Sequence, residues 1–141
     1  MWLVVALALP AVPGSLEYLH HNFYALRHGQ SLANVEGIIS SDPTVACTEH
    51  GLSAIGTEQA QRAAQAVCDE ALRTGVEGVA IISSDFRRAW QTAQAVRAGV
   101  LASGIATWPE ADILSAPALR ERSFGEVRGY RCTSYVWWGA L

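Results

Sequence analysis

The chain has 141 residues, half of them hydrophobic, with a net charge of −3 and an isoelectric point near 5.7. This length suits one domain with a moderate core, and the hydrophobic share excludes a disordered polypeptide. All ten basic residues are scattered arginines, which argues against nucleic-acid binding and excludes lysine chemistry such as a Schiff base or a Walker-type phosphate loop.

The N-terminal run at residues 1–13, MWLVVALALPAVP, is apolar but too short to span a membrane, which takes about 20 residues. It resembles the apolar part of a signal peptide, yet no basic segment precedes it. The three cysteines are widely spaced, without a zinc or disulfide pattern, and favour a reducing compartment. We therefore predict a cytoplasmic protein, with secretion or targeting to an organelle as the alternative.

Hydrophobic periodicity and glycine or proline punctuation predict strands and helices in alternation. The predicted strands are 22–27, 79–82 and 105–108, the predicted helices are 52–73 and 86–101, and long loops cover 28–51 and 109–129. This order predicts an α/β fold, a three-layer sandwich with a mostly parallel central sheet.

The chain divides by composition into three parts. Residues 1–21 are predicted to form an apolar extension or signal segment, residues 22–129 the folded domain, and residues 130–141 an atypical apolar tail. The tail is too short to be a membrane anchor, so no membrane span is predicted.

The first predicted strand ends in Arg27-His28-Gly29. A glycine turn leaves the two polar side chains at the strand's carboxyl end, where open α/β sheets bind their ligands. Histidine can act as a nucleophile near neutral pH, and arginine offers a charged fork suited to phosphate. The alternative is an arginine-histidine pair in a surface loop.

Two later segments carry further candidates. Arg88 lies in the first turn of the second predicted helix, against the helix dipole, as expected of a residue that meets an anion. The alternative is a solvated arginine. Glu121 lies between Arg120 and Arg122, either in a salt bridge or as an acid aimed at a phosphate pocket.

Three segments in this order resemble the histidine phosphatase superfamily, in its phosphoglycerate mutase-like branch. They are residues 26–31 (LRHGQS) with Ala33-Asn34, residues 83–93 (SSDFRRAWQTA) and residues 119–125 (LRERSFG). The similarity covers about residues 22–129. It implies a phosphoglycerate mutase-like fold, with phosphomonoester hydrolysis or phosphoryl transfer through a phosphohistidine.

The resemblance implies a role for each matching residue. His28 would attack phosphorus, Arg27 and Arg88 would hold the phosphoryl oxygens, and Glu121 would protonate the leaving alcohol and then activate water. The expected substrate-binding residues are Arg27, Gln30, Ser31, Asn34, Arg88 and Glu121. No metal or other cofactor is expected, because the arginines supply the positive charge, and the expected partner is a phosphorylated small molecule or phosphate.

One departure from the family pattern limits this prediction. The family carries a second catalytic histidine late in the sequence, whereas residues 126–141 contain none, and His50-Gly51 comes too early to replace it. We therefore expect a domain incomplete at its C-terminal end with impaired activity. The alternatives are a non-catalytic phosphate-binding or regulatory module and a non-functional truncated product. The sequence separates neither mutase from phosphatase nor one oligomeric state from another.

Overall fold

The computed structural model describes residues 2–8, 21–76, 78–108, 113–127 and 129. The predicted tail at 130–141 lies outside the described residues.

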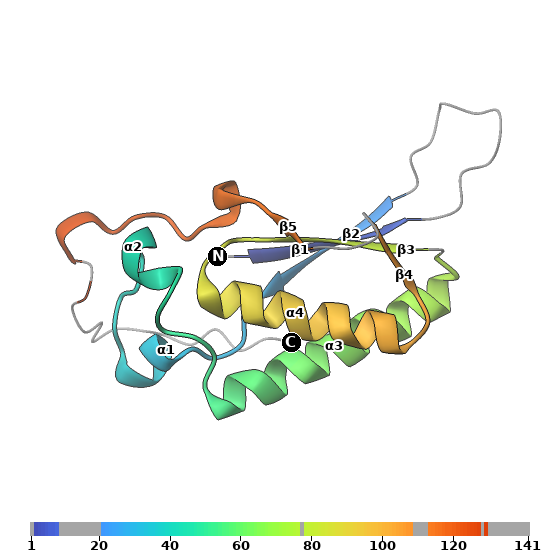
Figure 1. The fold of residues 1–141 in the computed structure, drawn as a ribbon, viewed down its shortest axis with the longest axis horizontal. Coiled ribbons are helices and arrows are strands. Elements are labelled where there is room, and N and C mark those ends of the chain that lie inside the picture. Colours follow the sequence, from blue (N-terminus) through green and yellow to red (C-terminus); the bar gives the residue numbers. More distant parts are fainter. Residues whose placement is uncertain (1, 9–20, 77, 109–112, 128, 130–141) are drawn as a thin grey trace.

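The described strands form one five-stranded sheet (Figure 1). Its strands are β1 (Trp2–Ala8), β2 (His21–Arg27), β3 (Gly78–Ser83), β4 (Ala106–Trp108) and β5 (Leu114–Ser115). The order is β2-β1-β3-β4, and β5 also pairs with β3. β4 and β5 run parallel to β3, whereas β1 is antiparallel to both β2 and β3. β2 and β3 therefore run in the same direction, and the predicted α/β class with a mostly parallel sheet is confirmed.

The strand β1 is the main difference from the prediction, which placed no strand before residue 22. β1 lies between β2 and β3, with Leu3 opposite both Leu26 and Ser83. An apolar stretch of seven residues suits a strand in the interior of a sheet. Val5 is completely buried. Trp2–Ala8 is thus part of the sheet.

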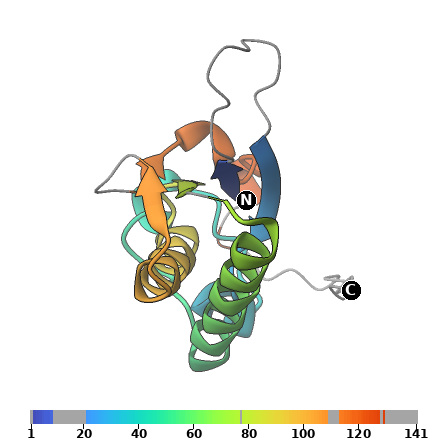
Figure 2. The ribbon, with the colours of Figure 1, turned by 90° about the vertical axis from the view of Figure 1, so that its right-hand side faces the viewer.

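Two long helices, α3 (Ala54–Thr74) and α4 (Arg87–Ala102), lie side by side on one face of the sheet (Figure 2). Small residues allow them to approach closely: a Cβ atom added at Gly99 of α4 would lie 3.1 Å from Ala64 Cβ of α3. Tyr24 and Leu26 of β2 pack against this core, whereas Phe23 is 67% exposed. Among the described residues the helices form one layer, so the third layer of the predicted sandwich is not seen there.

The loop predicted at 28–51 contains two short helices, α1 (Leu32–Glu36) and α2 (Pro43–Ala46). Ser31 and Asp42 cap their N-termini through side-chain oxygen atoms, and Gly37 ends α1 with φ of 70°. These two capped helices are too short to produce a recognisable hydrophobic periodicity in the sequence. The second loop contains β5 and the 3₁₀ turns η1 (Pro117–Leu119) and η2 (Gly125–Val127).

Within the described part of the chain, none of the helices is both long enough and apolar enough to cross a membrane.

Candidate active site

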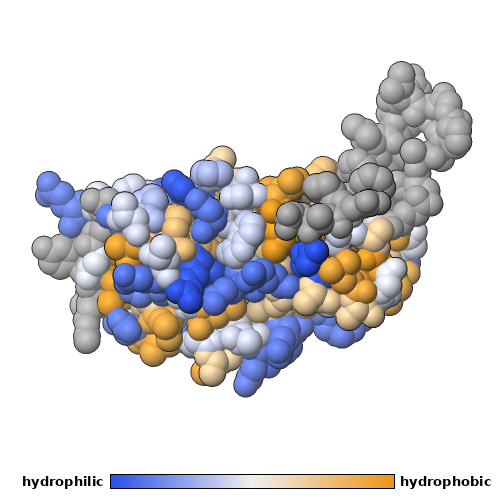
Figure 3. Space-filling view, in the orientation of Figure 1, coloured by the Kyte–Doolittle hydropathy of each residue, from blue (hydrophilic) through white to orange (hydrophobic). Residues whose placement is uncertain are grey.

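Three segments distant in sequence meet at one edge of the sheet. His28 follows β2, Arg88 lies in the first turn of α4 directly after β3, and Glu121 follows β5. The backbone N–H of Ala116 donates to Ser83 O at 2.8 Å, which joins the third segment to the end of β3. Hydrophilic side chains gather over this end of the molecule, around α2 and the beginning of α4 (Figure 3). The sequence prediction that these segments converge is consistent with this geometry.

The His28 ring is held in one orientation. Its Nδ1 atom lies 2.6 Å from Gly29 O, and a carbonyl oxygen only accepts, so Nδ1 carries the hydrogen. The pKa of His28 is lowered from 6.5 to about 3, chiefly by burial, and the charges of Arg88 and Arg27 add to this shift against the opposing effect of the Gly29 hydrogen bond. The imidazole is therefore neutral at pH 7, with a lone pair on Nε2.

The backbone after His28 is fixed by two glycines. A Cβ atom added at Gly29 would lie 2.3 Å from Gly56 O, and one added at Gly56 would lie 1.9 Å from Gln30 O. The N–H of Gly29 donates to Thr92 Oγ1 at 3.2 Å, and this hydroxyl donates to Arg88 O at 2.8 Å. The turn therefore packs directly against both α3 and α4, which sets the position of His28.

Arg88 is buried, with 3% of its surface exposed. Its Nη2 atom donates to Ser40 O at 2.9 Å and to Glu121 Oε2 at 3.1 Å, and its Nη1 lies 3.5 Å from Ser40 Oγ. The guanidinium stacks over the Phe86 ring, 5.2 Å from its centroid. The alternative of a solvated arginine is therefore wrong, because this charge is kept in the interior by a carboxylate and a backbone carbonyl.

Glu121 forms a salt bridge with Arg88, the first of the two alternatives that the sequence left open. The neighbouring Arg120 holds this segment in place by a two-pronged ion pair with Asp85. Its Nε donates to Asp85 Oδ1 at 2.7 Å and its Nη2 contacts Oδ2. The hydrogen bond with Arg120 lowers the pKa of Asp85. The ion pair joins the Glu121 segment to the start of α4.

The remaining predicted substrate-binding residues mostly make structural contacts. Ser31 is buried and caps α1, while Asn34 Oδ1 accepts from Ser31 N at 3.0 Å. Gln30 Oε1 accepts from Ser53 Oγ at 2.8 Å. Arg27 is exposed at the end of β2, and its charge acts on His28. The structure thus brings His28, Arg88 and Glu121 to one edge of the sheet. It ties the side chains of Gln30, Ser31 and Asn34 to the starts of α1 and α3.

Sequence reasoning missed three residues that shape the site: Ser40, Thr92 and Gly56. Ser40 contacts Arg88 partly through its backbone carbonyl, which leaves no trace in the side-chain pattern. His50 was noted only for its position before a glycine, yet its Nδ1 lies 2.9 Å from Ser40 Oγ.

Among the described residues, no group of three or more His, Cys, Asp or Glu side chains could hold a metal ion.

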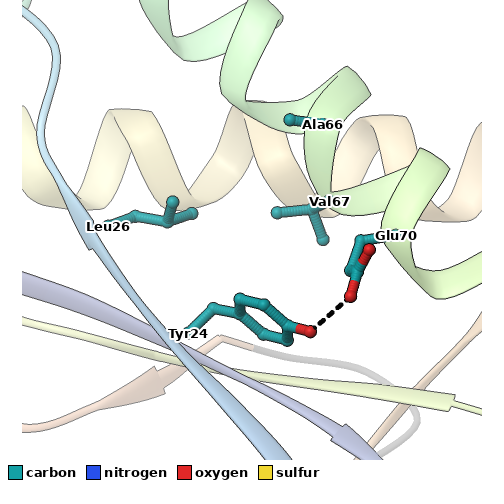
Figure 4. Close-up of a pocket in the computed structure, with 5 residues that line it drawn as sticks. All are labelled: Tyr24, Leu26, Ala66, Val67 and Glu70. Atoms are coloured by element: carbon teal, nitrogen blue, oxygen red, sulfur yellow. Dashed lines mark hydrogen bonds between the residues drawn. The ribbon is translucent and has the colours of Figure 1, made fainter. Parts of the chain in front are cut away.

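A separate cavity of about 260 Å³ lies between β2 and α3 (Figure 4). It is lined by Tyr24, Leu26, Ala66, Val67 and Glu70. The Tyr24 hydroxyl donates to Glu70 Oε1 at 2.6 Å. Hydrogen bonds from Arg73 and Tyr24 lower the pKa of Glu70 to about 2, and Glu70 forms an ion pair with Arg73. The lining contains neither an arginine nor a histidine, so the cavity is not the predicted phosphate site.

This is an α/β protein with a histidine, a buried arginine and a glutamate at the C-terminal ends of its parallel strands. These are the chemical groups of an anion-binding site. Comparison with known proteins is more specific. The family model of the histidine phosphatase superfamily (branch 1) matches residues 23–134, and the chain belongs to this superfamily.

Two solved structures are similar to this chain. One is described as mycobacterial hydrolase 1, and the other is a mycobacterial glucosyl-3-phosphoglycerate phosphatase in complex with VO3. Each is 28% identical with a TM-score of 0.52 and aligns with 74% of this chain. The alignments cover 41% and 40% of the two neighbours, so this chain spans about two fifths of their length. A search of curated proteins found no match.

Proposed function

We propose that this chain takes a phosphoryl group from a phosphorylated small molecule onto Nε2 of His28 and hydrolyses the phosphohistidine slowly. The single observation that carries the proposal is the His28 ring, which is neutral, oriented by Gly29 and close to the charge of buried Arg88. A neutral imidazole with its Nδ1 hydrogen bonded away presents one nucleophilic lone pair. Membership of the superfamily supports the same chemistry.

The reaction has two steps. In the first, Nε2 attacks phosphorus, the bond to the ester oxygen breaks, and the carboxylic acid of Glu121 gives its proton to the leaving alcohol. In the second, water attacks the phosphohistidine and gives its proton to the Glu121 carboxylate. Inorganic phosphate leaves, and the electron pair of the P–N bond returns to Nε2.

The arginines bind the transferred group. Arg27 and Arg88 carry the positive charge that stabilises the equatorial oxygens in the transition state. A phosphate that reaches Arg88 replaces Glu121 as the anion bound to it, which frees the Glu121 carboxyl group to act on the leaving oxygen. The side-chain N–H groups of Gln30 and Asn34 are further candidate donors, because their carbonyl oxygens accept from Ser53 and Ser31.

We expect the rate to be low. The histidines of this sequence are His20, His21, His28 and His50, so none follows Glu121 to serve as the family's second catalytic histidine. Loss of one preorganised donor costs on the order of 10²–10³ in rate. Hydrolysis of the phosphohistidine is then slow, and the intermediate accumulates.

The test uses purified chain with p-nitrophenyl phosphate carrying labelled phosphorus. We expect label on His28 that is stable in base and lost in acid, a burst of p-nitrophenol, and slow turnover afterwards. The His28→Ala variant should show neither label nor burst. Equal labelling of wild type and His28→Ala would refute His28 as the nucleophile, and turnover equal to that of a complete family member would refute the impairment.

The missing histidine also favours a second candidate, a non-catalytic module that binds a phosphate ligand. This candidate predicts that vanadate binds to the wild-type chain while no label reaches His28. A chain that unfolds without a cooperative thermal transition would instead be the non-functional product. The folded unit we propose is residues 22–129 together with the strand β1. The cysteine pattern of the sequence favours a cytoplasmic location.

A further inference from the structure

His50 has an unusual backbone conformation. Its φ is 50°, and it is the one non-glycine residue with positive φ among the described residues. This region favours glycine, and asparagine, aspartate and histidine adopt it more often than other residues, because a Cβ atom crowds the backbone there. Such conformations cost free energy and persist where the surroundings hold them, often at functional sites. The contacts of the His50 side chain and of the backbone beside it show what holds this conformation.

The side chain of His50 leads to Arg88. Its Nδ1 atom lies 2.9 Å from Ser40 Oγ, and Ser40 is itself buried. Ser40 Oγ accepts from Arg88 Nη1 at 3.5 Å and Ser40 O accepts from Arg88 Nη2 at 2.9 Å. A guanidinium only donates, so Ser40 Oγ accepts from Arg88 through one lone pair. Its contact with His50 Nδ1 uses the hydroxyl hydrogen in one imidazole tautomer and the second lone pair in the other, and it holds the Ser40 hydroxyl in both.

The backbone beside His50 is held from two sides. Gly51 O accepts from Leu32 N at 2.9 Å, at the start of α1, and Leu52 N donates to Gln91 Oε1 of α4 at 2.7 Å. A Cβ atom added at Gly51 would lie 2.6 Å from the same Gln91 oxygen. These contacts fix where the imidazole points, so the ring, Ser40 and Arg88 form one connected support.

We propose that His50 is a positioning residue for Arg88, acting through Ser40. It fixes the Ser40 hydroxyl so that this serine holds the guanidinium plane in the direction from which Arg88 meets the phosphoryl group. Without the imidazole, the Ser40 hydroxyl is no longer held in this orientation and the Nη1 contact is lost. This inference rests on the proposed phosphate-binding role of Arg88.

The test separates the effect of the His50 side chain from the effect of its backbone conformation. His50→Gly relieves the backbone strain but removes the hydrogen bond, whereas His50→Asn tolerates positive φ and places its Oδ1 where Nδ1 lies. The readouts are the affinity for vanadate and the rate at which His28 is labelled from p-nitrophenyl phosphate. Glu49→Ala, a change at an exposed neighbouring residue, is the matched control. The thermal unfolding of each variant is measured alongside.

We expect His50→Gly to weaken vanadate binding and slow labelling by about tenfold, and His50→Asn and Glu49→Ala to stay near wild type. Ser40→Ala should reproduce the loss, and combining it with His50→Gly should add nothing further. Three outcomes would overturn the inference while leaving the proposed function intact. His50→Gly could behave as wild type, His50→Asn could lose as much as His50→Gly, or the losses in the double variant could be additive. If wild type itself binds no vanadate and takes no label, the proposed function fails, and the role of His50 fails with it.

Discussion

The low pKa of His28 predicts that this residue stays a competent nucleophile in acid. Burial is the largest cause of the shift from 6.5 to about 3, followed among the lowering causes by Arg88 and Arg27. At pH 5 a histidine of pKa 3 is about 99% neutral, whereas one of pKa 6.5 is about 3% neutral. The difference in nucleophile concentration is about 30-fold, large enough to decide between a buried and an exposed ring.

The assay is the rate of labelling of His28 between pH 4 and 8, together with the ¹⁵N shifts of the labelled imidazole. We expect the Nε2 resonance of His28 to keep its neutral position down to about pH 4. In Arg27→Gln the midpoint should rise only slightly, because burial dominates the shift and Arg27 is exposed. A midpoint near 6.5 for His28 in the folded chain would refute the reasoning.

The same shift links stability to pH. Below pH 6.5 the unfolded chain binds a proton at residue 28 that the folded chain does not accept until about pH 3. The free energy of unfolding therefore falls as the pH drops through this window, by at most about 1.4 kcal/mol per pH unit from this residue. Denaturant unfolding of wild type and His28→Gln at several pH values isolates the effect, since the other titrating groups are common to both. Equal slopes for the two proteins would contradict it.

Three further predictions concern the surroundings of the site. Gly56→Ala places a Cβ atom 1.9 Å from Gln30 O. We expect the free energy of unfolding to fall by about 1–3 kcal/mol and vanadate to bind more weakly. Wild-type stability of this variant would show that the two backbones do not approach so closely. Ser53→Ala removes the cap of α3 and should cost about 1 kcal/mol by denaturant unfolding, whereas Ser53→Asp should keep most of it. Glu121→Gln should slow the labelling of His28 far more with an alkyl phosphate than with p-nitrophenyl phosphate, because only the poorer leaving group needs a proton; equal slowing would argue against Glu121 as the acid.

The helices and parallel strands were predictable because each carries a strong local signal. The α3 prediction of 52–73 compares with Ala54–Thr74 in the structure. The β3 and α4 boundaries differ by one residue at each end. The candidate residues His28, Arg88 and Glu121 were found for a similar reason, since each follows a strand or begins a helix and lies in a recognisable motif.

What the sequence did not show depends on contacts between distant segments. The strand β1 has the composition of a signal segment, and only its partners β2 and β3 distinguish the two. The contact between Gly29 and Gly56 joins backbones 27 residues apart. Ser40 acts through a carbonyl oxygen that every residue has. Such contacts are properties of the assembled chain, and local patterns do not encode them.

The position of β1 has a consequence for processing of the chain. β2, which ends beside His28, and β3, which leads to Arg88, are both paired with β1 in the described sheet. A peptidase that removed Trp2–Ala8 would leave each of these strands with a newly unpaired edge and would remove the strand that joins β2 to β3. A cleaved leader and this sheet are therefore mutually exclusive uses of the same residues, and mass spectrometry of the N-terminus of the protein made in cells would reveal which use applies.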